Sequence, residues 1–278
     1  MLVRVYAVGV NPADWKLRAG LLKDLFPVQF PYIPGYDVAG VVEEVGPGVT
    51  AFQKGQAVFG QSNRGTYAEY ITAPVATLAL TPETLDFDEA ATVSVGATTA
   101  WQGLFDHGKL EPGQRVLVLG AAGGVGLFAV QFARKIGAHV IGTASTHNLD
   151  FVRSLGANEV IDYTTTDVGN AVHEVDLVLD TVGGAALASV WPALKRGGTL
   201  VSIAGQPSAE KASELNVRTA GFSAQTSSDL LSTIAHLIDN GPVKVAVATR
   251  FSLSEAPKAH ELSQSGHGRG RIVLHIAE

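Results

Sequence analysis

The chain has 278 residues, of which 46% are apolar and 17% are charged, and its formal net charge is −6. These values are typical of a globular protein with one large or two ordinary domains, and the acidic balance argues against a nucleic-acid partner. The absence of cysteine excludes disulfides, thiolate zinc sites and cysteine nucleophiles. The chain start lacks a signal-peptide pattern and no apolar run reaches the roughly 20 residues of a membrane helix, so we expect a cytoplasmic protein with no membrane partner.

Residues 1–92 alternate short β-type runs with turn residues. The runs include "LVRVYAVGV", "VAGVVEEVG", "QAVFGQ" and "TYAEYITA", and prolines and glycines separate them. Short strands that are separated by prolines and glycines predict a β-rich domain. The same texture returns in "VKVAVATRFSL" and "GRIVLHI" near the end of the chain. We therefore expect residues 247–278 to rejoin the first domain.

Between these parts, strand patterns alternate with helix patterns. "RVLVLG" is a buried strand, "VGLFAVQFARKIG" a helix stopped by Gly137, and "AHVIGTAS" the next strand. "EVIDY", "VDLVLDTVG" and "TLVSIAG" are further strands, and "AALASVWPALKRGG" is predicted to be a helix closed by its paired glycines. This alternation predicts a doubly wound parallel sheet over residues 93–246, and an α/β fold class for the whole chain.

A glycine turn follows the first of these strands, in "VLVLGAAGGVG". Its glycines stand three apart at Gly120, Gly123 and Gly126, with an additional one at Gly124. A strand that opens through such a turn onto a helix directs backbone N–H groups and the positive end of the helix at one point, where a pyrophosphate binds well. The alternative is a tight turn without a ligand.

The second strand of this region indicates which dinucleotide is used. An NAD site usually places Asp or Glu there for the ribose 2′-hydroxyl, but the strand ends in "GTASTHN" with no carboxylate. Ser145, Thr146, His147 and Asn148 can donate hydrogen bonds to a 2′-phosphate, which favours NADP(H) over NAD(H). Alternatively, these residues only cap the next helix, and no Arg or Lys lies in this turn.

Several motifs together resemble one family. They are "GVNPADWKLRAG" (9–20), "PYIPGYDVAGVVEEVGPGVTAFQKGQAVFG" (31–60), "GTYAEY" (65–70), "GATTAW" (96–101), "GAAGGVG" (120–126), "LGANEVIDY" (155–163) and "GRGRIVL" (268–274). In this combination the chain resembles the medium-chain dehydrogenase/reductase superfamily, and within it the zinc-free NADPH:quinone oxidoreductase, or ζ-crystallin-like, branch.

The resemblance implies a domain plan and an assembly. A GroES-like catalytic domain would span residues 1–92 and 247–278, and a Rossmann cofactor domain would span 93–246. Hydride would pass from NADPH in a cleft between them, in a homodimer. Relatives have further residues before "VRVYAVGV", so either the assigned start is short or the GroES-like domain lacks its first strands.

The resemblance also implies site residues. Asn11 and Thr98 would lie by the nicotinamide, while Lys16 either binds a cofactor or substrate oxygen or lies on the surface. The cofactor would be held by Gly120, Ala122, Gly123, Gly124, Val125, Gly126, Ser145, Thr146, His147, Asn148, Tyr163, Val182, Ala204 and Arg269. Tyr163 is alternatively a strand-end aromatic residue, and Arg269 a surface residue.

The expected reaction is metal-free hydride transfer to a quinone or a similar electron-poor acceptor. Zinc-dependent relatives bind the metal with a Cys and the His of a G-H-E motif, whereas this chain has no Cys and reads Gly35-Tyr36-Asp37. The sequence shows no convincing acid–base pair, and quinone oxygens can take a proton from water.

Two other functions remain open at this point. One is reduction of α,β-unsaturated aldehydes, ketones or thioesters, with Lys16 or water supplying the proton. The thioester version is disfavoured, because Leu22 stands where those reductases carry a tyrosine donor. The other is a cofactor-binding scaffold with little turnover.

Overall fold

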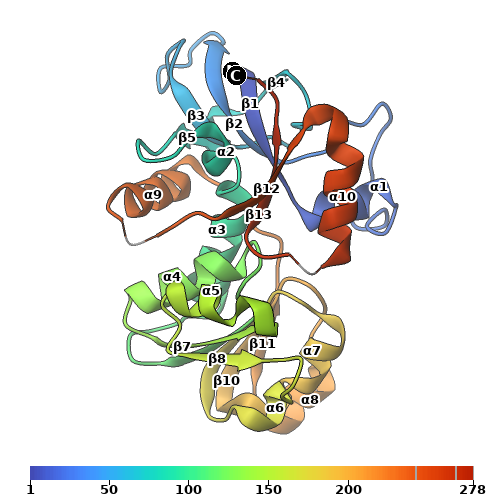
Figure 1. Ribbon diagram of the computed structural model, residues 1–278, viewed down its shortest axis with the longest axis vertical. Helices are drawn as coiled ribbons and strands as arrows, with labels where there is room; N and C mark the ends of the chain where they lie inside the picture. Colours follow the sequence, from blue (N-terminus) through green and yellow to red (C-terminus); the bar gives the residue numbers. More distant parts are fainter. Residues whose placement is uncertain (242, 267, 278) are drawn as a thin grey trace. The chain divides into compact units, whose positions relative to one another are not determined.

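The computed structural model describes residues 1–241, 243–266 and 268–277 (Figure 1). The chain divides into two compact units. Unit 1 comprises residues 1–98, 226–241 and 245–278, and unit 2 comprises residues 99–225 and 242–244. Among the described residues, no helix is both long and apolar enough to cross a membrane.

Unit 1 is built on a mixed sheet. Within the described residues its strands are β1 (Leu2–Val10), β2 (Asp37–Glu44), β3 (Ala57–Gln61), β4 (Tyr70–Thr72), β5 (Leu78–Leu80), β12 (Val247–Ser252) and β13 (Arg271–His275). They pair in the order β12-β13-β1-β2-β3-β5, and β4 also pairs with β1. All neighbours are antiparallel except β12 and β13. The carboxy-terminal strands therefore join the first strand in one sheet, as predicted.

The helices of unit 1 cover this sheet. They are α1 (Pro12–Arg18), α2 (Phe87–Ala90), α9 (Ser228–Asp239) and α10 (Ala256–Ser265), with short 3₁₀ segments at Val75–Thr77 and Leu253–Glu255. Helix α3 (Ser94–Trp101) begins in unit 1 and ends in unit 2. Helix α9 packs on β5, so residues 226–241 cluster with unit 1, whereas the sequence division had placed them with the second domain.

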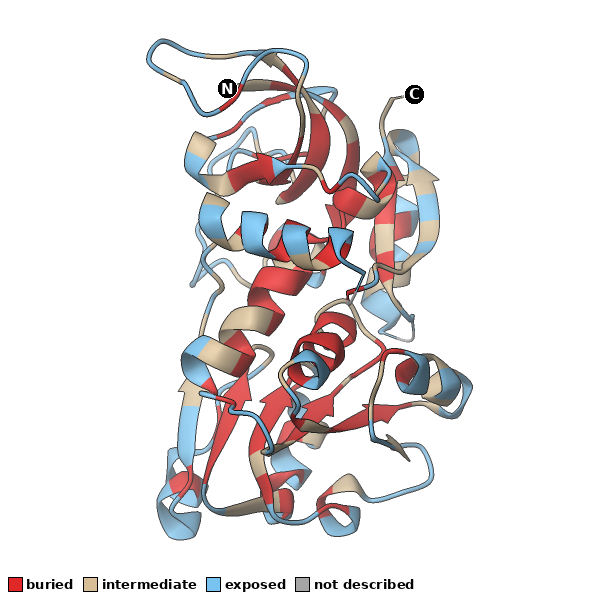
Figure 2. Ribbon diagram, turned by 90° about the vertical axis from the view of Figure 1, so that its left-hand side faces the viewer, coloured by how far each residue is buried: buried red, intermediate tan, exposed pale blue. Residues whose placement is uncertain are grey.

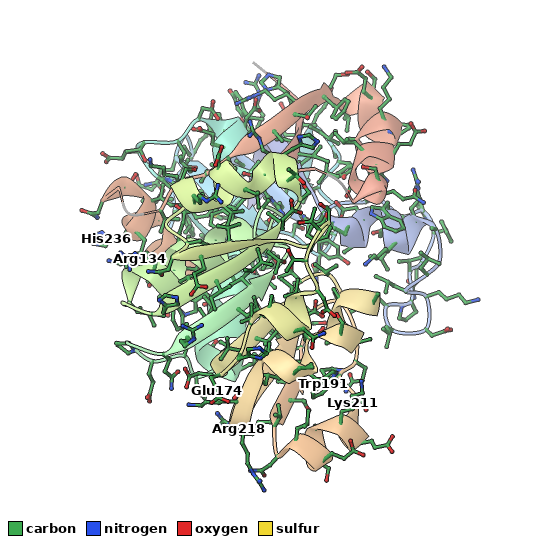
Figure 3. The ribbon with its side chains drawn as sticks, turned by 60° about the horizontal axis from the view of Figure 1, so that its bottom comes forward. Arg134, Glu174, Trp191, Lys211, Arg218 and His236 are labelled. Carbon is green, nitrogen blue, oxygen red and sulfur yellow. The ribbon has the colours of Figure 1, made fainter. Side chains whose placement is uncertain are left out.

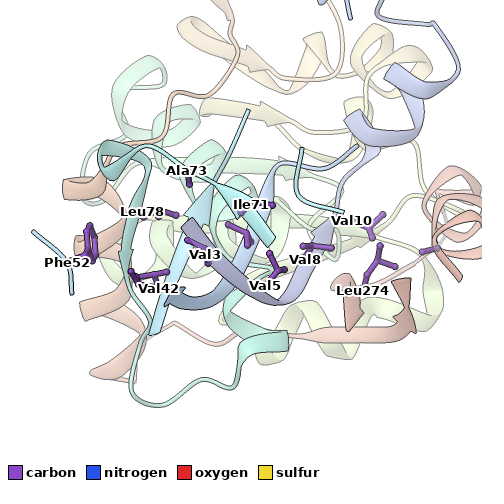
Figure 4. Packing of buried hydrophobic residues seen from close by; sticks show 13 residues of the cluster. Val3, Val5, Val8, Val10, Val42, Phe52, Ile71, Ala73, Leu78 and Leu274 are labelled. Atoms are coloured by element: carbon purple, nitrogen blue, oxygen red, sulfur yellow. The ribbon is translucent and has the colours of Figure 1, made fainter. Parts of the chain in front are cut away.

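Alternating apolar residues explain the core of unit 1. Val3, Val5 and Val8 of β1 are fully buried and pack with Val42 and Leu274 of its neighbours (Figure 4). Each such side chain stabilises the fold by about 1.5–3 kcal/mol through removal from water. Because β1 lies between β2 and β13, its side chains tie the two ends of the chain into one core.

Unit 2 is a parallel sheet with helices. Its strands are β6 (Arg115–Leu119), β7 (His139–Ala144), β8 (Glu159–Asp162), β9 (Val175–Asp180), β10 (Leu194–Ser202) and β11 (Arg218–Gly221), in the order β11-β10-β9-β6-β7-β8. Its helices are α4 (Gly126–Lys135), α5 (Leu149–Ser154), α6 (Val168–Ala171), α7 (Gly184–Ser189) and α8 (Ala209–Leu215), with a π-helical segment at Gln102–His107 and 3₁₀ segments at Thr146–Asn148 and Trp191–Ala193. The chain winds outward from β6 on one side and then from β9 on the other. The strand order therefore reverses between β6 and β9, which is where sheets of this kind bind their ligands.

Burial follows the predicted pattern in unit 2 (Figure 2). Four of the five residues of β6 are buried, as expected for a parallel strand covered on both faces. Helix α4 is buried over its first eight residues. Trp191, labelled in Figure 3, is 4% exposed and belongs to the core formed by β9, β10 and their neighbours.

One predicted element of unit 2 is wrong. The helix expected over "AALASVWPALKRGG" ends at Ser189, and strand β10 already begins at Leu194. Pro192 cannot continue a helix, and a register shift between Leu194 and Thr199 lets Gly197 and Gly198 lie inside β10. The paired glycines therefore belong to an irregular strand and do not close a helix.

Candidate functional site

The glycine turn joins the end of β6 to the start of α4. Gly120 has φ of +72°, a left-handed conformation that glycine adopts without strain. A Cβ atom on Gly126 would lie 2.2 Å from the carbonyl oxygen of Gly120. Glycine is therefore required at both positions for the helix to begin this close to the strand.

The turn leaves backbone donors free at the amino end of α4. Gly123 donates its N–H to the carbonyl of Gly120 at 2.9 Å. Within the described residues, the N–H groups of Ala122, Gly124 and Val125 have no hydrogen-bond acceptor. Helix α4 has ten residues, so its dipole adds to these donors. Free N–H groups at the reversal point of the sheet fit the pyrophosphate of a dinucleotide.

Two neighbouring strand ends are fixed by a buried carboxylate. Asp180, at the end of β9, accepts the N–H groups of Val182 and Gly183 at 2.9 Å each and the hydroxyl of Ser202 at 2.7 Å. Ser202, at the end of β10, accepts the N–H of Ala204 at 3.3 Å. These bonds position the predicted residues Val182 and Ala204. The sequence reasoning missed Asp180 and Ser202, although a carboxylate that ends an apolar strand was a usable signal.

The predicted 2′-phosphate residues lie together at one sheet edge. Strands β7 and β8 are parallel neighbours, and the N–H of Tyr163 donates to the carbonyl of Ala144 at 3.2 Å. Ser145 and Tyr163 therefore follow adjacent strand ends, and the Tyr163 side chain is half exposed. The side-chain amide of Asn148 donates to the Ser145 hydroxyl at 3.1 Å, and His147 is exposed.

A carboxylate stands at this edge as well. Asp162, the last residue of β8, accepts the hydroxyl of Thr146 at 2.6 Å and both the N–H and the hydroxyl of Thr164 at 2.9 and 2.6 Å. The Thr146 and Thr164 hydrogen bonds hold the pKa of Asp162 below its ordinary value. The "GTASTHN" segment contains no Asp or Glu, but Asp162 at the end of the neighbouring strand β8 places a negative charge beside it.

In unit 1, the predicted residue Asn11 belongs to a buried polar network. Asn11 is 2% exposed, its amide nitrogen donates to Asp37 at 2.9 Å, and its amide oxygen accepts from Arg271 at 3.0 Å. Arg271 also pairs with Asp37 at 2.8 Å. The network joins the residue that precedes α1 to β2 and β13, so Asn11 has a structural role. Its expected place by the nicotinamide stays a prediction.

Asp37 is the centre of that network. It is fully buried and also accepts the hydroxyl of Ser94 and, at 2.7 Å, the N–H of Val95. Burial raises the pKa of Asp37, and the guanidinium of Arg271 is the main influence that opposes the rise. Two of its donors come from the first turn of α3, so the same carboxylate fixes the starts of α1 and α3.

A second buried carboxylate, Asp14, lies in the first turn of α1. One of its oxygens accepts the N–H of Asn11 at 2.8 Å and the phenol of Tyr67 at 3.1 Å. The Tyr67 oxygen lies 3.1 Å from Nε2 of His260 on α10. Burial raises the pKa of Asp14 to about 7 and lowers the pKa of His260. The sequence reasoning found no acid–base pair because these residues are far apart in the chain.

Asp14→Asn is expected to remove a pH dependence of stability. The folded protein keeps a proton on Asp14 up to about pH 7, whereas the unfolded chain releases it near pH 4. The contribution of Asp14 to the free energy of unfolding is therefore full below pH 4 and falls by about 4 kcal/mol as the pH rises to about 7. Urea unfolding of both proteins between pH 4 and 8 measures this difference.

Between about pH 4 and 7, the free energy of unfolding of Asp14→Asn should rise relative to that of the wild type. Above about pH 7, the difference between the two proteins should stay constant. Asp24→Asn, which changes an exposed acid in the following loop, should follow the wild-type curve. Parallel curves for Asp14→Asn and the wild type would contradict the shifted pKa.

The other predicted residues of unit 1 are placed separately. Lys16 is partly exposed on α1, and its Nζ lies 5.7 Å from the ring centroid of Trp15. Thr98 on α3 is fully buried, and its hydroxyl has no partner in the described part of the chain. Arg269 is exposed, just before β13. The expected place of Thr98 by the nicotinamide stays a prediction.

The "GYD" segment offers a phenol and a buried carboxylate as its side chains. Tyr36 is a half-buried phenol whose pKa is raised by burial and by the charge of Asp14. Among residues 1–241, 243–266 and 268–277, no group of three or more His, Asp or Glu side chains could hold a metal ion.

Comparisons with known proteins agree with this architecture. Residues 1–83 match the family model described as alcohol dehydrogenase GroES-like domain, and residues 155–274 match the one described as zinc-binding dehydrogenase. Quinone oxidoreductase of Mus musculus is 34% identical, over 99% of this chain and 88% of that protein. NADPH-dependent alkenal/one oxidoreductase of Arabidopsis thaliana is 33% identical, over 99% and 72%. The solved quinone oxidoreductase of Coxiella burnetii has 34% identity and a TM-score of 0.89, over 99% of this chain and 90% of that one.

Matches of this extent, over both a GroES-like and a Rossmann part, show the family as well as the fold. They confirm the resemblance seen in the motifs and the α/β class. The chain is an oxidoreductase that belongs to the quinone oxidoreductase branch of the medium-chain dehydrogenase/reductase superfamily.

Proposed function

We propose that this protein transfers hydride from NADPH to a quinone or a similar electron-poor acceptor without a metal ion. The observation that carries the proposal is the glycine turn, where free N–H groups meet the start of α4 at the reversal point of the sheet. Relatives that are quinone or alkenal/one oxidoreductases support the reaction class.

The choice of NADPH rests on the edge formed by β7 and β8. Ser145, His147, Asn148 and Tyr163 offer donors and a half-exposed ring there, and one relative is named for its dependence on NADPH. The Thr146 hydroxyl is already donated to Asp162, so it has no proton left for a phosphate. The negative charge of Asp162 also opposes binding of the 2′-phosphate, and so opposes the preference for NADPH.

The chain's own residues would bind and orient the reactants. The glycine turn would hold the pyrophosphate, while Val182 and Ala204, fixed by Asp180 and Ser202, would face the nicotinamide half of the cofactor. A bound reduced nicotinamide supplies the hydride. Thr98 would offer its free hydroxyl to it, and these contacts accelerate transfer by positioning and by exclusion of water. Arg269 is proposed as a further phosphate contact.

Independence from zinc is proposed from the donor set. The chain has no cysteine, and Tyr36 stands where zinc-dependent relatives place a histidine ligand. A phenol beside a raised-pKa carboxyl is a poor replacement for neutral imidazole and thiolate, which zinc sites prefer.

The second candidate is reduction of α,β-unsaturated carbonyl compounds. Lys16 favours it, because a partly exposed ammonium on α1 can bind a carbonyl oxygen. The alkenal/one oxidoreductase relative supports the same class of acceptor.

Cofactor titration followed by an acceptor panel tests the proposal. We expect tighter binding of NADPH than of NADH by fluorescence, and consumption of NADPH with at least one quinone after treatment with a chelator. Tighter binding of NADH would refute the cofactor choice. Binding of NADPH without turnover on any quinone or enone would instead indicate a cofactor-binding scaffold.

Asp162→Asn is expected to tighten NADPH binding about fivefold and to change NADH binding less than twofold. The substitution removes a charge near the proposed 2′-phosphate but keeps an oxygen for Thr146, and the repulsion between two nearby negative charges is screened by water. Isothermal titration with both cofactors measures it. Asp150→Asn, which changes an exposed acid on α5, should leave both affinities unchanged, and an equal shift for both cofactors would contradict the assignment.

Assembly and location complete the proposal. A homodimer in the cytoplasm is proposed from the family resemblance. Light scattering on the purified protein tests the first, and fractionation of the source cells tests the second.

A further inference from the structure

Three side chains of unit 1 form a hydrogen-bonded chain that the proposed function does not use. Asp14 comes from α1, Tyr67 from the loop before β4, and His260 from α10. The Tyr67 oxygen lies 3.1 Å from Oδ2 of Asp14 and 3.1 Å from Nε2 of His260. The phenol therefore links an acid and a base that do not touch each other.

The two residues at the ends of this hydrogen-bonded chain are buried. Asp14 is 0% exposed and His260 is 2% exposed, while Tyr67 is partly exposed. Oδ1 of Asp14 and Nδ1 of His260 have no partner among the described residues. Buried polar atoms normally have hydrogen-bond partners. The two unpaired atoms, one at each end of the hydrogen-bonded chain, therefore indicate that these three residues do more than pack.

The chain can pass one proton from end to end. When His260 is protonated, its Nε2–H donates to the Tyr67 oxygen, and the Tyr67 O–H donates to the carboxylate of Asp14. Transfer of one proton along both bonds leaves neutral His260 and protonated Asp14. Both hydrogen bonds then point the other way, and no atom other than hydrogen has moved.

The surrounding charges favour storage of that proton on Asp14. Burial and, less strongly, the charge of Asp37 raise the pKa of Asp14, against the hydrogen bonds from Asn11 and Tyr67 and the charge of Arg271. Burial and the cation of Arg18 lower the pKa of His260. The phenols of Tyr32 and Tyr36, which also face Asp14, have raised pKa values and stay neutral. At neutral pH the imidazole is therefore the better donor and the carboxyl the better store.

We propose that Asp14, Tyr67 and His260 form a proton relay that stores and replaces the proton consumed when a conjugated carbonyl compound is reduced. The inference rests on the proposed function, because it assumes that hydride comes from a reduced nicotinamide. It deepens that function by naming the enone or enal as an acceptor class that this site is equipped to reduce.

The chemistry distinguishes this class from quinones. Hydride adds to the β-carbon of an enone, and the electron pair of the broken double bond forms an enolate that must take one proton. A reduced quinone places its negative charge on oxygen, which water protonates readily, whereas general-acid assistance speeds proton transfer by about 10²–10⁴-fold.

Asp14 acts through an intermediary. Because it is fully buried, its proton leaves through Tyr67, the partly exposed member of the relay: the Tyr67 O–H is given to the enolate, and the Asp14 proton replaces it. The Asp14 carboxylate that remains takes a new proton from His260 through Tyr67.

Steady-state kinetics with two acceptors in parallel test the relay. With NADPH, 1-octen-3-one and 1,4-benzoquinone are given to the wild type, Tyr67→Phe and Asp14→Asn. We expect kcat for the enone to fall about 10- to 100-fold in both variants, and kcat for the quinone to stay within about twofold. In the wild type, enone turnover should fall as the pH rises through about 7. Asp14→Asn should not show this fall.

Matched controls separate the relay from a structural effect. Tyr70→Phe, an exposed tyrosine on β4, should match the wild type with both acceptors. His260→Gln breaks the far end of the relay, so it carries the test if Tyr67→Phe does not fold.

Each contrary outcome has a distinct meaning. An equal loss for both acceptors, or no loss in any variant, would overturn the relay. Wild-type turnover of the quinone without the enone would overturn the relay and leave the proposed function standing. No turnover of either acceptor would overturn the proposed function, and the relay with it.

Discussion

Arg271→Met is expected to lower the free energy of unfolding by about 3–5 kcal/mol, the typical effect of the removal of one partner from a buried ion pair. Arg271 and Asp37 are 4% and 0% exposed and lie 2.8 Å apart. The substitution leaves the Asp37 carboxylate buried without its counter-charge, although other donors remain. Chemical denaturation at pH 7 measures the loss.

A surface pair supplies the control for this prediction. Arg153→Met breaks the exposed pair with Asp150 and should change stability by less than about 1 kcal/mol. The double variant Asp37→Leu/Arg271→Met removes both charges and should recover part of the loss. If Arg271→Met were as stable as Arg153→Met, the pair would not hold unit 1 together.

Gly126→Ala is expected to disrupt the glycine turn and to weaken NADPH binding by more than about tenfold, that is, by more than about 1.4 kcal/mol. The new Cβ would lie 2.2 Å from the carbonyl oxygen of Gly120 and 2.7 Å from the Cα of Ala121. Both contacts are with backbone, so the start of α4 must move away from the turn. Fluorescence titration with NADPH and thermal unfolding measure the two effects.

Substitutions at two other glycines serve as controls for Gly126→Ala. A Cβ on Gly123 would lie 3.3 Å from the Gly120 oxygen, a tight contact but a longer one than at Gly126, so Gly123→Ala should lower the unfolding temperature less than Gly126→Ala does. A Cβ on Gly46 would meet nothing within 4 Å, and Gly46→Ala should leave both stability and binding unchanged. Wild-type NADPH affinity in Gly126→Ala would show that the turn does not hold the cofactor.

The sequence predicted those elements whose signals are local. The alternating texture of β1 and the strand–turn–helix of residues 115–135 were both confirmed. The prediction was wrong where a local signal had two meanings: Gly197 and Gly198 are typical of a helix end, but α7 ends at Ser189, Pro192 lies in a short 3₁₀ segment, and the glycines enter β10.

The parts of the site that were missed depend on distant contacts. Tyr67 is 53 residues from Asp14 and 193 residues from His260, and no pattern along the chain connects them. Asp162 was missed for a related reason. The acid of an NAD site is expected at the end of β7, but a parallel sheet brings the end of β8, about twenty residues later, to the same edge.

The pairing of β13 with β1 has a consequence for synthesis of the chain on the ribosome. Arg271 is 234 residues from Asp37, so the carboxylate of Asp37 is made long before its counter-charge. Unit 2 is nearly complete once residue 225 has been made, and domains generally fold as units during translation. We expect unit 2 to fold first, and the amino-terminal strands of unit 1 to complete their ion pair only after Arg271 has been made.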